Sequence, residues 1–323
     1  KEYIRMKRID IVVPCYNEEE CICLLFERVE KVFSNIEGYK FRIVYVDDGS
    51  VDETLTKIKR LAEDIGEDTI KYISLSRNFG KEAAMFAGLQ NADGDAVVLM
   101  DADLQHPPEL IPYMLKVLEE GYDCCGARRK DRKGEPVIRS FFSTCFYRVI
   151  NGLSKVDLSQ NGSDYRMISP KVVRAMISLN ERERFTKGIF SWVGFSTKWL
   201  EYENVERVAG TTKWSMAALL GYAVNGIIAF ATAPLRGVVY LGMFITFISF
   251  IYAIYVFYNA IFHPGARSGY ATITLLLLFL GGVIILLLGV IGEYLARIYI
   301  EVKQRPIYIE KETNIYAKGT NDK

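Results

Sequence analysis

The apolar segment between Leu235 and Ile291 constrains the fold more than any other feature of this sequence. Only Arg236 and Arg267 carry a charge within it. Two stretches of the segment, 235–262 and 271–292, each exceed the roughly 20 residues that a helix needs to cross about 30 Å of hydrocarbon. The sequence therefore predicts a soluble domain joined to a membrane anchor of two spanning helices.

The charges beside these stretches predict their orientation. The link between them carries Arg267, whereas several basic residues follow the second stretch, among them Arg297, Lys303, Arg305 and Lys311. Basic residues gather on the cytoplasmic side of membranes, so both termini and the soluble domain are expected in the cytoplasm, at the plasma membrane. The polar, basic opening 1–8 has no apolar signal core and agrees with that expectation.

Bulk composition excludes some classes of protein. The chain has 40 basic and 39 acidic residues, which argues against a polybasic nucleic-acid-binding protein. The cysteines match neither a paired C-x-x-C zinc site nor a small disulfide framework, and we expect them to be reduced. They are Cys15, Cys21, Cys23, Cys124, Cys125 and Cys145.

Strand and helix patterns alternate through the first hundred residues. Short β-branched runs predict strands, and apolar residues at helical spacing predict the helices between them. The predicted strands are 9–13, 41–46, 70–75 and 96–100, and the predicted helices are 18–33, 53–65 and 81–89. Repeated units of this kind indicate an α/β fold with a mainly parallel sheet and helices on both faces.

Polar residues follow each predicted strand, at 14–18, 47–50, 76–78 and 101–103. Ligands of such sheets bind beyond the carboxyl ends of the strands, so a site is expected at this edge. The chain has neither a G-x-G-x-x-G fingerprint nor a G-x-x-x-x-G-K-[ST] loop. A Rossmann dehydrogenase and a P-loop ATPase are therefore disfavoured.

The pair Asp101 and Asp103 is the sharpest local signal at that edge. Two carboxylates one residue apart can hold a hard divalent cation, which can in turn bridge a diphosphate. Gln105 offers a third oxygen ligand. A structural role is expected for His106, because nitrogen ligands suit Mg²⁺ poorly.

Together these motifs resemble those of family 2 glycosyltransferases. The resemblance rests on Val13–Glu18, Val46–Ser50, Ser76–Lys81 and Asp101–Glu109, and it extends from about Ile9 to Arg297. It is closest to the polyprenyl-phosphate sugar transferases, which include bactoprenol-phosphate glucosyltransferases and, more distantly, dolichyl-phosphate mannose synthases. It implies a GT-A fold and inverting transfer of a sugar from a nucleotide donor to a lipid phosphate.

The same resemblance implies roles for individual residues. Asp101, Asp103 and Gln105 would hold Mg²⁺ or Mn²⁺, and Asp103 and Asp164 would be catalytic. The implied nucleotide-binding residues are Pro14, Tyr16, Glu18, Asp47, Asp48, Arg77, Lys81 and Asp101. The implied acceptor phosphate-binding residues are Arg128, Arg139 and Ser143, the last two being one helical turn apart.

The chemistry of the acceptor bears on Asp164. A phosphate monoester has a second pKa of roughly 6, so near neutral pH it is mostly a dianion and already a nucleophile. Asp164 is therefore expected to orient the sugar or contact the metal rather than to remove a proton.

The expected organisation has four parts. A cytoplasmic catalytic domain covers 1–210, and an amphipathic interfacial helix covers 211–233, opening near Lys213 and Trp214. The two spanning helices lie within 234–295, and 296–323 form a cytoplasmic tail. The resemblance also implies a homo-oligomer, specifically a tetramer, and a separate flippase and downstream glycosyltransferase as partners.

The function expected is transfer of glucose or N-acetylglucosamine from a UDP-sugar to undecaprenyl phosphate, giving a lipid-linked sugar for glycosylation of a cell-envelope polymer. Mannosyl transfer from GDP-mannose is an alternative. A processive polysaccharide synthase is disfavoured because such enzymes carry a Q-x-x-R-W segment and this chain has no Arg-Trp pair. A scaffold or flippase is disfavoured because two spans are few for a transport path and have no acidic residue before Glu293.

Overall fold

The computed structural model describes residues 6–130, 162–203, 233–262 and 269–315. Its sheet, within these ranges, contains β1 (Lys7–Cys15), β2 (Tyr39–Asp47), β3 (Ile70–Leu75), β4 (Ala96–Leu99), β5 (Cys124–Arg129), β6 (Gly162–Ile168), β7 (Thr197–Tyr202) and β8 (Glu310–Thr313). The α-helices are α1 (Ile22–Phe33), α2 (Thr54–Ile65), α3 (Lys81–Gln90), α4 (Ile111–Glu119), α6 (Pro170–Ser178), α7 (Thr186–Trp192), α9 (Ala233–Phe262) and α10 (Tyr270–Val302).

The strands form one sheet in the order β7-β5-β6-β4-β1-β2-β3-β8. The four central strands β4, β1, β2 and β3 are parallel to one another. β6 runs antiparallel between β4 and β5, while β5 and β7 are parallel. The expected α/β fold with a mainly parallel sheet is therefore confirmed.

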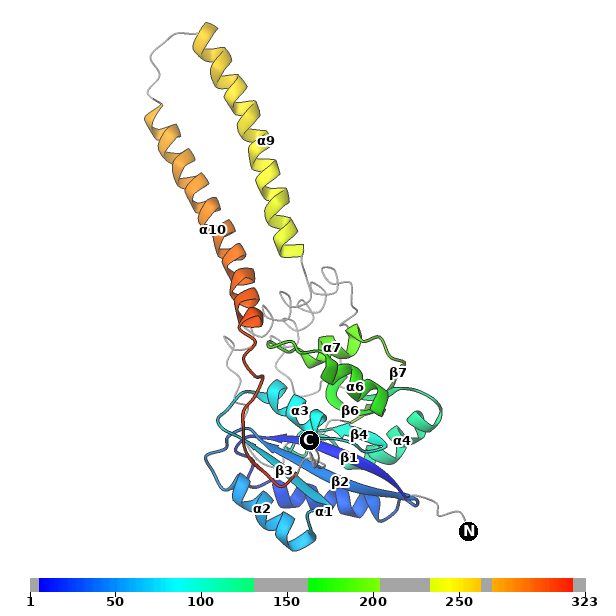
Figure 1. The fold of residues 1–323 in the computed structure, drawn as a ribbon. Coiled ribbons are helices and arrows are strands. Elements are labelled where there is room, and N and C mark those ends of the chain that lie inside the picture. The colour runs from blue at the N-terminus through cyan, green and yellow to red at the C-terminus, as the bar shows by residue number, and fades with distance from the viewer. Residues whose placement is uncertain (1–5, 131–161, 204–232, 263–268, 316–323) are drawn as a thin grey trace, which may run out of the picture.

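Two apolar cores lie on opposite faces of this sheet, because alternate residues of a strand point to opposite sides. Ile11 of β1 packs with residues of α1, α2 and α4. Its neighbour Val12 packs with residues of α3, α6 and α7. Figure 1 shows the resulting three layers, with α1 and α2 beneath the sheet and α3, α6 and α7 above it. Such burial on both faces explains the continuous β-branched runs of the central strands.

The first helix begins later than its apolar pattern predicts. The pattern favours a start at Glu18, but α1 begins at Ile22. The preceding loop is bonded to the next β-α connection instead: the Glu18 amide donates to Thr54 Oγ1 at 2.8 Å and the Asn17 amide donates to Ser50 Oγ at 2.9 Å. These long-range bonds hold residues 17 and 18 against the connection between β2 and α2, and the helix begins beyond them.

The last strand returns from the far end of the chain. β8 follows α10 and pairs antiparallel with β3 at the edge of the sheet. Asn314 strengthens the junction, since its side chain accepts from the Tyr72 amide at 2.9 Å and donates to the Ile70 carbonyl at 3.1 Å. Part of the segment expected as a C-terminal tail is thus a strand of the α/β domain.

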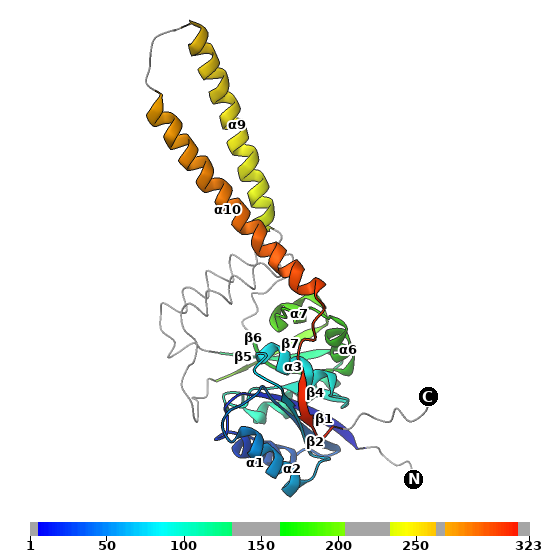
Figure 2. The same cartoon turned by 60° about the vertical axis from the view of Figure 1, so that its left-hand side comes forward.

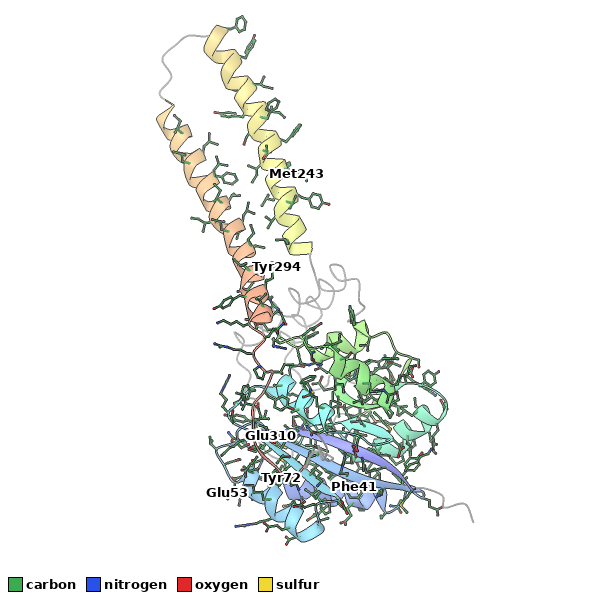
Figure 3. All side chains as sticks on the ribbon, in the orientation of Figure 1. Phe41, Glu53, Tyr72, Met243, Tyr294 and Glu310 are labelled. Carbon is green, nitrogen blue, oxygen red and sulfur yellow. The ribbon has the colours of Figure 1, made fainter. Side chains whose placement is uncertain are left out.

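Helices α9 and α10 form a long hairpin that projects from the α/β domain (Figures 1 and 2). Within α10, Phe279–Val302 is long and apolar enough to cross a membrane, and α9 contains a shorter apolar stretch, Gly237–Tyr252. Figure 3 shows side chains such as Met243 pointing away from the protein, and this side chain is 55% exposed. The expected interfacial helix 211–233 lies outside the described residues, apart from its last position.

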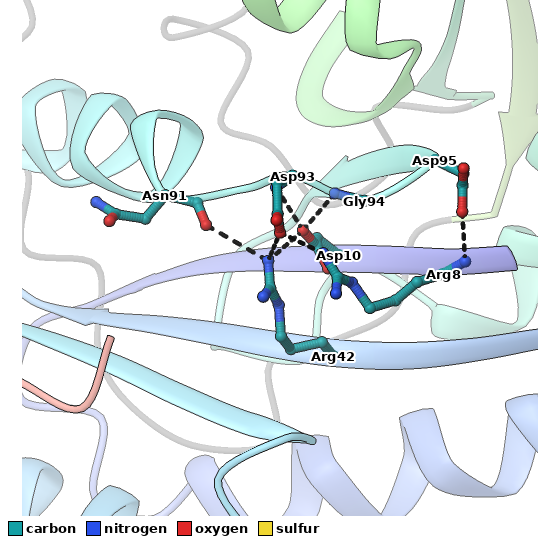
Figure 4. A network of polar contacts seen from close by, with 7 residues as sticks. All are labelled: Arg8, Asp10, Arg42, Asn91, Asp93, Gly94 and Asp95. Carbon is teal, nitrogen blue, oxygen red and sulfur yellow. Dashed lines mark hydrogen bonds and ion pairs between the residues drawn. The ribbon is translucent and has the colours of Figure 1, made fainter. Parts of the chain in front are cut away.

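A buried ionic network holds the sheet together at the end opposite the polar loops (Figure 4). The Asp10 carboxylate is fully buried and accepts from Arg42 Nη2 at 2.5 Å, Arg8 Nε at 2.9 Å and the Gly94 amide at 2.7 Å. Asp93 Oδ1 contacts both guanidinium groups. The network joins β1, β2 and the α3–β4 connection, so it fixes three elements at once.

Substituting Asp10 by alanine is expected to lower the free energy of unfolding by about 3 kcal/mol, because it leaves the buried Arg42 guanidinium with Asp93 as its remaining carboxylate partner. Chemical unfolding of the full chain in detergent measures this change. The exposed ion pair between Lys198 and Glu120 provides the control, since Lys198→Ala should have a much smaller effect. Equal effects of the two substitutions would contradict the prediction.

Candidate active site

The polar loops lie at one edge of the sheet because of the strand directions. The carboxyl ends of β1, β2, β3 and β4 share this edge, and the antiparallel β6 brings its amino end to it. Arg166 of β6 pairs with Leu99 of β4, so Asp164 lies near Asp101, which follows β4. Residues far apart in the sequence thus meet at the predicted edge.

Lys81, at the first position of α3, connects these two acidic residues. Its Nζ lies 2.6 Å from Asp101 Oδ1 and 2.9 Å from Asp164 Oδ2. Desolvation of the amine alone would lower its pKa, but the two carboxylates outweigh that effect and raise the pKa of Lys81 above its ordinary value. Desolvation alone would raise the pKa values of Asp101 and Asp164, but the Lys81 ammonium outweighs that effect. Both pKa values therefore lie below their ordinary range.

His106 has the structural role expected for it. Its Nδ1 accepts a hydrogen bond from the Asp101 amide at 3.0 Å, and its ring stacks on Tyr165 with centroids 5.0 Å apart. Burial lowers the pKa of His106, which keeps the ring neutral. The imidazole therefore holds the backbone of the acidic turn in place.

The acidic pair Asp47 and Asp48, at the end of β2, is directed into the protein. Asp48 is almost completely buried, and its oxygens accept from the Phe79 amide at 2.7 Å and the Gly80 amide at 2.9 Å. Asp47 accepts from the Ser50 amide at 3.0 Å and from Ser74 Oγ at 2.9 Å. Both carboxylates thus hold the loops of the site edge together.

Gly49 lets two of these loops touch. Its φ is +70°, and a Cβ at this position would lie 2.6 Å from the backbone carbon of Arg77. Any side chain here would push the loop after β3 away. The close approach explains why a glycine follows the acidic pair.

The remaining predicted nucleotide-binding residues lie on the same loops. Pro14 is near the end of β1, paired with Val46. Tyr16 and Glu18 follow that strand, with the Tyr16 ring 37% exposed. The Arg77 guanidinium lies over the Phe79 ring at 4.2 Å and donates to the Asn78 carbonyl at 3.0 Å.

The predicted acceptor residues are described only in part. Arg128, near the end of β5, forms an ion pair with Glu201 of β7 at 2.6 Å. Both side chains are about half exposed, so this pair is open to competition from another anion. Arg139 and Ser143 lie outside the described residues.

The predicted metal ligands fit a divalent cation in their chemistry. Among the described residues no three His, Cys, Asp or Glu side chains surround a common point. Mg²⁺ does not need such a cage, because it is usually held by one or two carboxylates together with substrate phosphates and water. Asp101 and Asp103 supply two carboxylates, Gln105 an amide oxygen, and the position of the Lys81 ammonium shows that this edge stabilises positive charge.

Sequence reasoning missed one polar contact beside the site. Glu82 accepts from the Thr186 amide at 2.9 Å and from the Thr186 hydroxyl. No motif marks this contact, since its partners are a hundred residues apart in a region of mixed pattern. A polar residue adjoining Lys81 on a mostly apolar helix was the available signal.

Comparison with known proteins agrees with this architecture. Residues 10–176 match the glycosyl transferase family 2 model, and residues 233–298 match the GtrB C-terminal hairpin model. The chain is 47% identical to the putative glycosyltransferase CsbB of Bacillus subtilis, over 96% of this chain and 93% of that protein. It is 40% identical to the SfII prophage-derived bactoprenol glucosyl transferase of Shigella flexneri, over 95% of this chain and 98% of that protein.

Solved structures resemble the chain less closely. The mannosyl-3-phosphoglycerate synthase of Rubrobacter xylanophilus has a TM-score of 0.49 and 15% identity, covering 72% of this chain and 74% of that one. This likeness is too low to transfer any property. The family match and the near-complete coverage of both relatives are decisive on their own: the chain belongs to glycosyltransferase family 2, in the group that carries the GtrB-type helical hairpin.

Proposed function

We propose that this glycosyltransferase moves a sugar from a UDP-sugar to a polyprenyl phosphate, with inversion at the anomeric carbon. The observation that carries the proposal is the cluster of Asp101, Lys81 and Asp164 at the carboxyl edge of the sheet, in a chain that also bears a long apolar hairpin. Relatives named bactoprenol glucosyl transferase, about 40% identical over nearly their whole length, support a polyprenyl-phosphate acceptor. Glucose and N-acetylglucosamine are the two sugars proposed.

The loops around this cluster form the donor site in the proposal. Tyr16, Glu18 and Arg77 face the nucleoside, while Asp47 and Asp48 set the shape of the loops through their internal hydrogen bonds. Asp101, Asp103 and Gln105 would hold Mg²⁺ or Mn²⁺, which supplies positive charge for the diphosphate leaving group. Lys81 adds a fixed ammonium beside the same position.

Asp164 orients the sugar in this proposal and does not act as the base. Its pKa is held below the ordinary range by Lys81, once desolvation is outweighed, and such a carboxylate is a weak proton acceptor. The acceptor phosphate needs no base, since its second pKa is roughly 6 and it is a dianion at neutral pH. Arg128, Arg139 and Ser143 bind that phosphate.

The hairpin places the enzyme at its acceptor. A polyprenyl tail cannot leave the bilayer cheaply, because each buried CH₂ group contributes about 0.8 kcal/mol. We propose that α9 and α10 both cross the plasma membrane and that the α/β domain faces the cytoplasm, where basic residues gather after α10. The lipid-linked sugar would then need a separate flippase and a further glycosyltransferase. In this proposal the enzyme is a homotetramer.

Release of UDP by the purified full chain tests the proposed function. A panel of UDP-sugars and GDP-mannose is supplied with and without undecaprenyl phosphate. We expect UDP release that depends on the lipid phosphate, with one UDP-sugar preferred. Release of GDP from GDP-mannose alone would favour the dolichyl-phosphate-mannose-synthase-like alternative, and the absence of UDP or GDP release from every donor would refute the proposal.

A further inference from the structure

A polar network connects the helical hairpin to the helix that carries Lys81. It runs along segment 179–186, which joins α6 to α7. The end of α10 lies beside this segment, as Figure 2 shows, and the start of α3 contacts its other end. None of these contacts belongs to the donor loops described above.

The end of α10 holds segment 179–186 by two contacts. Glu301 Oε1 accepts from the Arg182 amide at 2.7 Å. One turn earlier, Arg297 Nη1 lies 2.9 Å from Glu183 Oε2, and the Arg297 side chain is only 15% exposed. An ion pair with one largely buried partner is less screened by solvent than an exposed pair, so it holds the segment more firmly.

Arg184 anchors the middle of the segment. Its guanidinium is buried, donates to the carbonyls of Leu179 and Met176, the latter at 3.1 Å, and lies over the Phe86 ring of α3 at 4.2 Å. The segment therefore cannot shift without disturbing α6 and α3.

Glu82 joins the segment to the start of α3. A single oxygen, Oε2, accepts both the amide and the hydroxyl of Thr186, the first residue of α7. Glu82 follows Lys81 directly in the first turn of α3, so the two share a backbone whose position the Glu82 carboxylate helps to set. The bonds to Thr186 therefore fix the start of α3, including Lys81, relative to α7.

A cavity of about 710 Å³ lies at the junction, lined among others by Phe86, Arg182, Glu301 and Tyr308. The contacts of Arg297 and Glu301 cross the junction beside this cavity, and the pairing of β8 with β3 provides a second attachment.

We propose that Glu82 and Thr186 are positioning residues, which fasten Lys81 to segment 179–186 and, through Arg297 and Glu301, to the hairpin. The inference rests on the proposed function only in taking Lys81, Asp101 and Asp164 as the reacting centre. Its consequence is that attachment of the hairpin sets the geometry of the donor site, beyond holding the enzyme at a membrane. Displacements of about 1 Å in such a site can cost 10²-fold in rate.

The test compares Thr186→Val, which removes the hydroxyl but keeps the shape, with Thr186→Ser, which keeps the hydroxyl. In the full chain we expect Thr186→Val to lower kcat about tenfold, with the donor KM and the Kd for UDP within about twofold, as loss of positioning requires. Thr186→Ser should restore most of kcat. A purely structural role would instead reduce the number of UDP-binding sites, and that result would overturn the proposal.

A double-mutant cycle tests the link to the hairpin. If Arg297 acts through Thr186, the double variant Arg297→Ala with Thr186→Val will lose less kcat than the product of the two single-variant fold-losses. Lys198→Ala removes an exposed ion pair elsewhere and should leave kcat unchanged. Strictly multiplicative losses would remove the hairpin from the network.

Hydrogen exchange tests the same link without any reaction. The amides of Ala83 and Ala84 donate to the Gly80 carbonyl at the start of α3. We expect faster exchange of these amides in Arg297→Ala and in Thr186→Val, and unchanged exchange in Lys198→Ala. Unchanged exchange in all three variants would overturn the proposal, even if sugar transfer is confirmed. Faster exchange would support it even if no sugar transfer were found.

Discussion

Substituting Asp101 by asparagine is expected to lower kcat by about 10²–10³-fold, a loss typical of removing one preorganised charged group from an active site. Asparagine keeps the size of the side chain but loses the charge that Lys81 Nζ contacts at 2.6 Å. In the proposed function it also loses one ligand of the cation on the diphosphate. The fold should survive, because the His106 ring accepts a hydrogen bond from the amide of residue 101, and asparagine keeps that bond.

UDP release by the full chain measures this loss, and thermal unfolding checks that the variant is folded. Asp68→Asn makes the same chemical change at an exposed position before β3 and should leave kcat unchanged. Chelation of the wild-type protein by EDTA should lower kcat to a similar degree, with Mg²⁺ or Mn²⁺ restoring it. Full turnover in excess EDTA would rule out the cation, and full turnover by Asp101→Asn would remove this residue from the site.

Substituting Asp164 by asparagine is expected to lower kcat by about 10²-fold or more while UDP still binds, because the residue orients the sugar and not the nucleotide. The pH profile separates this role from that of a base. The wild-type carboxyl, with a pKa below its ordinary value of about 3.9, stays ionised throughout the range above about pH 5. It therefore contributes no change in rate between neutral and alkaline pH.

The rate should fall only on the acidic side, below about pH 6, where the acceptor phosphate takes up its second proton. The profile of kcat/KM against pH for the wild type and Asp164→Asn provides the measurement, and the two curves should have the same shape. A limb near pH 7 that is present in the wild type and absent from Asp164→Asn would identify a base and contradict the assignment.

The strands that position the site were predictable because their signals are local. The strands β1, β2 and β4 are rich in β-branched residues, and each ends at a polar turn. Burial on both faces of a parallel sheet favours that pattern. Convergence of the polar loops followed from the strand directions alone. The helical boundaries were less accurate, since the start of α1 depends on bonds to Ser50 and Thr54, which no local pattern reports.

The rest of the site depends on pairings between distant segments. β8 reads Glu-Lys-Glu-Thr, a charged sequence with no apolar alternation, and such charges are common on edge strands. Lys81 contacts both Asp101 and Asp164 only because β6 lies antiparallel beside β4. The sequence of β6 does not predict that pairing. All three residues were predicted to belong to the site. Lys81, however, was predicted to bind the nucleotide, whereas in the structure it lies between two carboxylates.

The pairing of β8 with β3 has a consequence for how the protein is made. β3 is complete early in synthesis, but its partner is added only after both hairpin helices have been translated. Throughout that interval the edge of β3 exposes unpaired backbone groups, which favour association with other chains. Synthesis at about 5–20 residues per second makes this a period of many seconds. The nascent domain is therefore most prone to aggregate while its hairpin is emerging, and the pairing of β8 with β3 ends that risk.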